Sequence, residues 1–450
     1  MSDAYDLIVI GAGMAGTTAA NKAAAAGWRT AIVDRLPYGG TCALRGCDPK
    51  KILRRSAEII HAAGLMTGKG IDPAGLAVNW QDLMAHKRGF TGPVPQRVER
   101  QLSSNGVDTL HGTATFVSPT TLAVDGEVHE SRRFLVATGA RPRPLEFPGA
   151  ERVIDSTAFL ELADLPERIV FIGGGFVSFE FAHIAARAGA TVTILDRGPR
   201  LLKAFDPDLV ELLIARSAAI GVQVCRNTTV ERIGAGQPGS RLDLVSDGQP
   251  DTLDADLVVH GAGRVPDIDS LDLDAANVAH SPKGITVAPH LQSTTSDAVF
   301  AAGDAADTPG MPLTPVAVIE AKVATSNLLN GTTRVPDHRG VPTAVFTIPE
   351  LVRVGQLEEE ACASAADLDV RYTDTSGWYS NYRIGETTAA VKILIDRATD
   401  TIVGAHMLGP EYAELINIIG LTIKLGMTTK ELKSMTAAYP TVGSDLASML

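Results

Sequence analysis

The chain has 450 residues, too many for one ordinary hydrophobic core, so we expect two to four domains. A net charge of −12 argues against a large nucleic-acid-binding surface. No apolar run is long enough to span a membrane and no signal peptide is recognisable, so we expect a cytoplasmic protein. Four cysteines are too few for a secreted disulfide framework, which leaves redox chemistry, metal binding or coincidence.

The first segment has the pattern of a dinucleotide-binding unit. An apolar strand over residues 5–10 precedes a glycine turn and an alanine-rich helix, and a second strand over 30–34 ends with Asp34. In such a turn the first glycine makes the bend, the second admits a pyrophosphate and the third lets helix and strand pack closely. These glycines are Gly11, Gly13 and Gly16. A glycine turn without a ligand is the simpler alternative.

The same pattern recurs after residue 167. A strand over 168–172 leads into Gly173 and Gly175, and a strand over 191–196 ends with Asp196. Ser178 takes the third glycine position and is small enough to keep the helix close. Two dinucleotide sites in one chain suggest electron transfer between a flavin and a nicotinamide, unless the repeat is empty.

The residues after the second repeat give conflicting signals about the nicotinamide. Asp196 suits the ribose hydroxyl of NAD, whereas Arg197 and Lys203 suit the 2′-phosphate of NADP. We expect NADPH, because a phosphate needs such charge and a hydroxyl does not. NADH stays open, since both cations could simply be solvated.

Two cysteines lie in the segment Gly39–Lys51, which reads GGTCALRGCDPKK. We expect a long helix over residues 42–63, in which Cys42 and Cys47 approach disulfide distance if Gly46 distorts the helix start. A helix N-terminus and the cations Arg45, Lys50 and Lys51 would stabilise a thiolate there. Zinc would need two further ligands and no Cys or His pair is suitably spaced, so we predict no metal site.

The remaining segments predict the fold class. Strands meet glycine turns at residues 134–139, 257–263 and 300–303, and from residue 341 alternating strands and two late helices (411–425 and 429–435) indicate an α+β unit. The expected fold is α/β, with two Rossmann-like domains and a C-terminal α+β domain. The expected segments are 1–149 and 266–335 for the first dinucleotide domain, 150–265 for the second and 336–450 for the C-terminal domain.

Together these motifs resemble the class I pyridine nucleotide–disulfide oxidoreductases, the family of glutathione reductase, dihydrolipoamide dehydrogenase and mercuric reductase. The resemblance covers almost the whole chain and rests on GAGMAG, GGTCALRGCDPKK, VATG, GGGFVSFE, AAGDAAD, LTPVA and FTIPELVRVG. It implies an FAD domain, an NAD(P) domain inserted within it, and a C-terminal dimerisation domain that makes a homodimer.

The resemblance also implies residue roles. Cys47 becomes the thiol beside the flavin, Cys42 the thiol that attacks substrate, Lys51 the lysine near flavin N5 and Glu180 its ion-pair partner. Phe176 stands where many members have a tyrosine over the nicotinamide pocket. The expected FAD residues are Gly11, Gly13, Gly16, Asp34, Gly40, Thr41, Thr138, Gly139, Gly303 and Asp304. The expected NAD(P) residues are Gly173, Gly175, Phe176, Asp196, Arg197, Lys203 and Gly263.

Several positions depart from the family pattern. Tyr439 replaces the C-terminal histidine that serves the attacking thiol as acid–base, and Ser444 stands where its glutamate should be. A phenol, with an ordinary pKa near 10, is a poor base at neutral pH. Asp48 puts a carboxylate beside Cys47, and Asn21 and Lys22 replace arginines of glutathione reductase. A packing role for Tyr439 at the dimer interface is the simpler alternative.

The expected function is electron transfer from NADPH through FAD to the Cys42–Cys47 disulfide. From there electrons reach an unidentified small-molecule acceptor: a disulfide, a metal ion or a quinone. One alternative is a diaphorase or quinone reductase that uses the flavin directly. Another is a lipoamide dehydrogenase-like subunit of a larger complex. We expect neither nucleic acid nor membrane as a partner.

Overall fold

The computed structural model describes residues 4–364 and 367–450, which form two compact units. Unit 1 comprises Met1–Lys50, His86–Arg143 and Arg264–His338, and unit 2 comprises Lys51–Ala85, Pro144–Gly263 and Arg339–Leu450. The finer division into four segments stays a prediction. Within the described residues, no helix combines the length and the apolar character needed to cross a bilayer.

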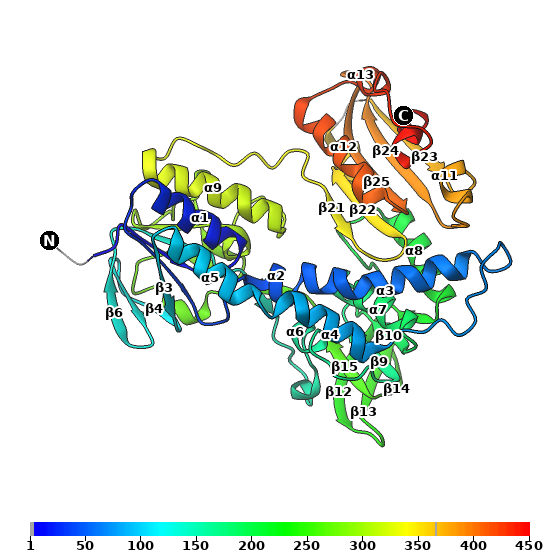
Figure 1. Cartoon of the computed structure of the whole chain (residues 1–450), viewed down its shortest axis with the longest axis horizontal. Helices are drawn as coiled ribbons and strands as arrows, with labels where there is room; N and C mark the ends of the chain where they lie inside the picture. Colours follow the sequence, from blue (N-terminus) through cyan, green and yellow to red (C-terminus); the bar gives the residue numbers. More distant parts are fainter. Residues whose placement is uncertain (1–3, 365–366) are drawn as a thin grey trace. The chain divides into compact units, whose positions relative to one another are not determined.

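Unit 1 is built on a five-stranded parallel sheet in the order β19-β7-β1-β2-β3. The central strand is a continuous apolar run whose residues are all buried, as expected of a parallel strand covered on both faces. Helices α1 and α9 lie side by side (Figure 1). The main elements are β1 (Leu7–Ile10), α1 (Met14–Ala25), β2 (Thr30–Asp34), α2 (Gly40–Arg45), α5 (Val94–Ser104), β3 (Val107–His111), β7 (Phe134–Val136), β19 (Val299–Ala301) and α9 (Thr314–Asn330).

Small sheets and turns complete unit 1. Unit 1 also contains a three-stranded antiparallel meander, a two-stranded sheet and a second three-stranded sheet. Their strands are β4 (Ala114–Ser118), β5 (Thr121–Val124), β6 (Glu127–Glu130), β8 (Ala140–Pro142), β16 (Arg264–Pro266), β17 (His280–Ser281), β18 (Gly284–Thr286) and β20 (Ala306–Asp307).

Unit 2 repeats the first motif with a four-stranded parallel sheet in the order β11-β10-β9-β15. An antiparallel meander of three strands follows β11 in the chain. The elements are α6 (Ser156–Phe159), β9 (Arg168–Ile172), α7 (Phe176–Arg187), β10 (Thr191–Leu195), α8 (Pro207–Ala219), β11 (Val222–Cys225), β12 (Thr228–Ala235), β13 (Ser240–Ser246), β14 (Gln249–Ala255) and β15 (Leu257–His260).

The C-terminal part of unit 2 is a five-stranded antiparallel sheet in the order β21-β22-β25-β24-β23, against which α12 packs (Figure 1). The predicted fold class is therefore confirmed. The elements are β21 (Thr343–Val345), β22 (Glu350–Gly355), α10 (Glu358–Ser364), β23 (Leu368–Asp374), α11 (Tyr379–Tyr382), β24 (Ala390–Asp396), β25 (Thr401–Gly409), α12 (Tyr412–Leu425), α13 (Thr429–Lys433) and α14 (Leu446–Met449).

The prediction of one continuous helix over residues 42–63 is wrong, because the structure has two helices there. Cys42 belongs to the short helix α2, and a separate helix α3 runs from Cys47 to Leu65. Gly46 separates them, because its backbone angles of φ −146° and ψ −117° are not helical. Helix α4 (Trp80–Thr91) follows α3 in the chain. The meanders β4–β6 and β12–β14 were not predicted, because they include largely exposed strands, such as β6 and β14, that carry little apolar periodicity.

An ion cluster in unit 2 joins the starts of α8 and α10 to strand β24. The Lys392 ammonium on β24 lies 2.8 Å from Asp206, 2.6 Å from Asp208 and 2.8 Å from Glu358. Burial opposes the charge of Lys392, yet the hydrogen bonds from these three carboxylates raise its pKa. Asp206 also caps α8, where its side chain accepts from the amides of Asp208 and Leu209. The cluster thus fixes the start of α8 against β24.

We predict that Lys392→Met destabilises unit 2. The substitution leaves the buried Asp206 carboxylate without its cation, and breaking a buried pair in this way costs about 3 kcal/mol or more. Urea unfolding followed by tryptophan fluorescence measures the loss. Lys283→Met, at an exposed lysine, is the control and should change stability by less than about 0.5 kcal/mol. Equal stability of the two variants would contradict the prediction.

Candidate functional site

The first glycine motif in unit 1 has the geometry expected of a nucleotide cradle. Helix α1 begins after Gly13, which gives no side-chain cap, so the amides of the first turn point toward a ligand position. A Cβ on Gly16 would lie 1.8 Å from the Gly11 carbonyl oxygen, so helix and strand meet closer than any other residue allows. Asp34, at the end of β2, accepts from the Ala12 amide at 2.7 Å and from the Leu36 amide at 2.9 Å.

Other predicted residues of unit 1 border the same cradle. Gly40 has φ +67°, and a Cβ there would lie 2.4 Å from Gly13 Cα, so the cysteine motif and the glycine motif touch through their backbones. The Thr138 hydroxyl is buried and has no hydrogen-bond partner among residues 4–364 and 367–450. Burial raises the pKa of Asp304, and Glu320 adds to the rise. A buried hydroxyl and a buried acid in the strand-end turns fit the polar groups of a bound cofactor.

The structure brings the two predicted redox sulfurs together. The Cys42 and Cys47 side chains hydrogen-bond, with Cys42 in α2 and Cys47 at the first position of α3. Thr314, at the start of α9, also hydrogen-bonds Cys42, a contact that sequence reasoning missed although LTPVA was noted. The Asp48 carboxylate lies 4.0 Å from the Cys42 sulfur.

The sequence predicted a lowered thiol pKa for the pair, and for Cys42 this prediction is wrong, because its pKa is raised. The hydrogen bond with Cys47 raises the pKa of the Cys42 thiol, and burial and the negative charge of Asp48 raise it further. The hydrogen bond from Thr314 lowers this pKa, by less than Cys47 or burial raises it but by more than Asp48 does. Cys42 therefore holds its proton at neutral pH unless a cation replaces it.

The second glycine motif, in unit 2, repeats the first in detail. Helix α7 begins after Gly175, again without a side-chain cap. Asp196, just past β10, accepts from the Gly174 amide at 2.6 Å and from the Gly198 amide at 2.7 Å. Arg197 and Lys203 are exposed beside it. Gly263 follows β15, and a Cβ on Gly173 would contact Gly261 and Ala262 of that turn at 2.5 Å.

Lys51 and Glu180, which were predicted to form an ion pair, both contact Phe346 in unit 2. The Lys51 ammonium lies 3.7 Å from the centre of the Phe346 ring, and Glu180 Oε1 accepts from the Phe346 amide at 2.8 Å. Phe176, the residue predicted to lie over the nicotinamide pocket, is the first residue of α7 and is 47% exposed. Sequence reasoning missed Phe346, although FTIPELVRVG contains it.

The C-terminal motif carries no imidazole–carboxylate pair at the predicted positions. Tyr439 is 85% exposed in the single chain. Ser444 is engaged with backbone, because its hydroxyl donates to the Thr441 carbonyl at 2.6 Å and accepts from the Thr441 amide at 3.2 Å. Of the described residues, only Asp206, Asp208 and Glu358 gather as a potential metal-ligand group, and Lys392 already bonds all three.

Known proteins match this chain along nearly its full length. It is 30% identical over 453 residues to the mercuric reductase of Lysinibacillus sphaericus, covering 99% of the chain and 82% of the relative. It is 31% identical over 449 residues to the dihydrolipoyl dehydrogenase of Bacillus subtilis, covering 98% and 96%. It is 29% identical over 457 residues to the glutathione reductase of a Nostoc strain, covering 99% of both.

A solved structure has the same fold. The HOCl-induced flavoprotein disulfide reductase RclA of Escherichia coli, determined as a Cu(II) complex, superposes with a TM-score of 0.89 at 27% identity and covers 100% of this chain and 99% of its own. The family model for pyridine nucleotide-disulphide oxidoreductases matches residues 5–321, and the model for their dimerisation domain matches residues 341–449. The chain therefore belongs to the pyridine nucleotide–disulfide oxidoreductases and is an FAD-dependent enzyme of that family.

Proposed function

We propose that the enzyme passes electrons from NADPH through FAD to the Cys42–Cys47 pair, and from that dithiol to a thiophilic metal cation such as Cu(II). The single observation that carries the choice of acceptor is the Asp48 carboxylate 4.0 Å from the Cys42 sulfur. This carboxylate is unfavourable for a thiolate but favourable for a cation that binds the sulfur.

The protonation of Cys42 supports a cation as substrate. Cys47, burial and Asp48 raise the pKa of the thiol, so a free thiolate able to attack a disulfide is scarce at neutral pH. A bound metal cation displaces the thiol proton and cancels the repulsion from Asp48. Oxidation of the dithiol to the disulfide then releases two electrons, one for each of two Cu(II) ions reduced to Cu(I), and the two thiol protons pass to solvent.

The C-terminal motif supports the same acceptor class. Reduction of a disulfide leaves a thiolate that must be protonated, which is the task of an acid–base at the attacking thiol. Tyr439 occupies that position in the sequence and Ser444 is engaged with backbone. Metal reduction needs no proton donor. By their names, relatives of the chain include mercuric reductases, and the structural neighbour RclA was solved with Cu(II).

The cradle of unit 1 fits FAD. The uncapped start of α1 suits a pyrophosphate, Asp34 suits a ribose, and the buried Thr138 hydroxyl and Asp304 supply polar groups for the rest. When bound, FAD accepts two electrons from a nicotinamide and passes them to the cysteine pair. In our assignment Cys47 faces the flavin and Cys42 the acceptor, while Lys51 and Glu180 set the charge beside the ring.

NADPH is the nicotinamide that the second motif favours. Arg197 and Lys203 are both exposed beside Asp196 and are available for the 2′-phosphate. The dimerisation domain supports a homodimer related by a two-fold axis, in which Tyr439 of each chain reaches the cysteine pair of the other.

We predict that Arg197→Ala with Lys203→Ala raises the KM for NADPH about ten- to a hundredfold and leaves the KM for NADH nearly unchanged. The two cations contact a phosphate that NADH lacks. Steady-state kinetics with both nicotinamides measure the change. Arg200→Ala, which removes a neighbouring cation 3.9 Å from Glu359, is the control. Equal losses with both nicotinamides would refute the phosphate assignment.

We predict that Cu(II) reoxidises the NADPH-reduced enzyme faster than glutathione disulfide, lipoamide or a quinone does. Stopped-flow absorbance of the flavin under anaerobic conditions gives the rates, and a Cu(I)-specific chelator gives the product. Cys42→Ser should slow the Cu(II) reaction on the order of a hundredfold. Cys362→Ser, at an exposed cysteine outside the pair, is the control and should react normally. A quinone rate that survives Cys42→Ser would favour the diaphorase alternative.

We predict that Asp48→Asn speeds the alkylation of Cys42 and slows the reduction of Cu(II). Loss of the carboxylate lowers the pKa of the Cys42 thiol, because Asp48 raises it in the native protein. Iodoacetamide should therefore label Cys42 of the reduced variant about threefold or more faster at pH 8, while Cu(II) reduction slows. Peptide mass spectrometry across a pH series measures labelling. An unchanged pH profile would rule out Asp48 as a charge neighbour of Cys42.

A further inference from the structure

A buried loop in unit 2 links β21 to β22 and carries Phe346. Residues 347–349 are buried but belong to neither helix nor strand, so their polar backbone atoms need partners from elsewhere. Thr347 is fully buried, and its hydroxyl donates to the Pro349 carbonyl at 2.7 Å. The conformation of the loop therefore depends on hydrogen bonds from side chains of other elements.

Ionisable side chains of α3 and α7 supply those groups. The Phe346 amide donates to Glu180, and the Ile348 amide donates to His183 Nδ1 at 3.1 Å. Arg187 donates to the Ile348 carbonyl at 2.9 Å, and Arg54 donates to the Thr347 carbonyl at 3.1 Å. Each of three consecutive residues, Phe346 to Ile348, thus has a backbone group held by a charged or imidazole side chain.

The helical periodicity explains how two helices reach one loop. On α7, Phe176 is followed at steps of four, three and four residues by Glu180, His183 and Arg187, which places all four on one face. On α3, Lys51 and Arg54 follow the same rule and the face continues to His61.

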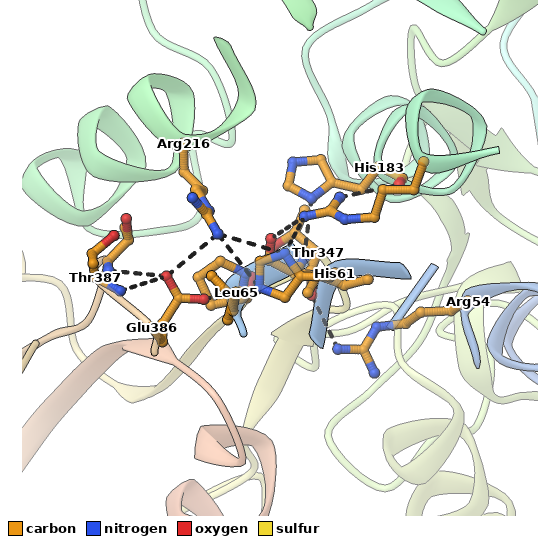
Figure 2. Close-up of polar contacts among 12 residues, drawn as sticks. Arg54, His61, Leu65, His183, Arg216, Thr347, Glu386 and Thr387 are labelled. Atoms are coloured by element: carbon orange, nitrogen blue, oxygen red, sulfur yellow. Dashed lines mark hydrogen bonds and ion pairs between the residues drawn. The ribbon is translucent and has the colours of Figure 1, made fainter. Parts of the chain in front are cut away.

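Hydrogen bonds and ion pairs also hold these faces toward the C-terminal ends of α3 and α7. His61 Nε2 lies 2.9 Å from Glu386 Oε2, and Arg187 donates to His61 Nδ1 at 3.2 Å (Figure 2). Arg216 of α8 lies 3.6 Å from Glu386, whose other contacts are the amides of Thr387 and Thr388. Figure 2 shows Arg216, His61 and Glu386 converging beside His183. The network leaves α7 and the loop little freedom to shift.

The hydrogen bonds of His183 define which of its ring nitrogens carries the proton. Its Nδ1 accepts from the Ile348 amide, so Nε2 carries the hydrogen and donates to Ser217 Oγ at 2.9 Å. Ser217 in turn donates to the Leu213 carbonyl at 2.7 Å. Complete burial lowers the pKa of His183 far below its usual range, and Arg187 adds to the effect. The imidazole is therefore neutral and acts as a fixed acceptor.

We propose that His183 is a positioning residue for the Lys51–Glu180 pair, because it holds Ile348 and through it Phe346. Phe346 meets both members of that pair: its ring lies under the Lys51 ammonium and its amide bonds Glu180. A shift of the loop would move the ammonium and the carboxylate together. The inference rests on the proposed roles of Lys51 and Glu180 beside the flavin, and it is independent of the acceptor.

Two substitutions of His183 distinguish the role of its Nδ1 from that of its Nε2. His183→Asn keeps an acceptor at the position of Nδ1, which faces the loop, and loses the contact with Ser217. His183→Gln keeps a donor near the position of Nε2 and loses the acceptor for Ile348. Ser217→Ala removes the other hydrogen bond without touching the loop. If His183 acted only in packing α7 against α8, Asn and Ser217→Ala would be the harmful changes.

The expected result is that His183→Gln lowers the limiting rate of flavin reduction by NADPH about tenfold or more, while the NADPH dissociation constant stays the same. His183→Asn and Ser217→Ala should stay within about twofold of the native rate. Amide hydrogen exchange of the apoprotein gives a readout without flavin: residues 346–348 should exchange faster in His183→Gln alone. Native rates and native exchange in His183→Gln would overturn the inference.

Lys51→Met distinguishes this inference from the proposed function. If Lys51→Met slows flavin reduction and His183→Gln does not, only the role of His183 fails. If Lys51→Met reduces at the native rate, the assignment of Lys51 itself fails. The double variant should be no slower than Lys51→Met, because His183 acts through that lysine. Should His183→Gln not fold, fast exchange of the Phe346 and Ile348 amides in the native apoprotein would still refute the inference.

Discussion

Both nucleotide cradles depend on one interaction, a carboxylate at the end of a parallel strand that holds the glycine turn of the strand beside it. Asp34 bonds the Ala12 amide and Asp196 bonds the Gly174 amide, each while accepting a second amide two residues further along its own segment. The bond fixes the turn that opens α1 or α7, and so aims the uncapped amides of each helix. The acid therefore fixes its glycine turn through backbone hydrogen bonds alone.

This local character explains what the sequence predicts well. The strands at Thr30–Asp34 and Arg168–Ile172 coincide with the expected ranges, because a buried parallel strand is a short apolar run ended by a turn. The break between α2 and α3 was not expected as a boundary, since only the backbone angles of Gly46 end the first helix. The loop contacts of His183 and Arg54 join residues more than 160 positions apart, and no local pattern reports them.

The charge on the cysteine pair shows why a motif alone does not give reactivity. The sequence places cations at residues 45, 50 and 51 and predicts a stabilised thiolate. In the structure the two largest effects on Cys42 are its hydrogen bond with Cys47 and its burial, and both raise the pKa of the thiol. The hydrogen bond from Thr314 lowers this pKa, and the charge of Asp48 raises it by a smaller amount. Distance and burial decide which neighbours count. In the proposed function a substrate cation offsets the charge of Asp48, which a neutral disulfide would leave in place.

Helix α3 gives the proposed chemistry its rigidity. Within unit 2, Lys51, Arg54 and His61 lie on one face of this helix, so a single backbone sets the spacing between their side chains. Further along that face, Arg54 bonds the loop of Phe346, and His61 bonds Glu386. Sites built on packed helices hold their groups more closely than sites on free loops. Here the irregular loop gains comparable order, because side chains from two helices occupy its backbone polar groups.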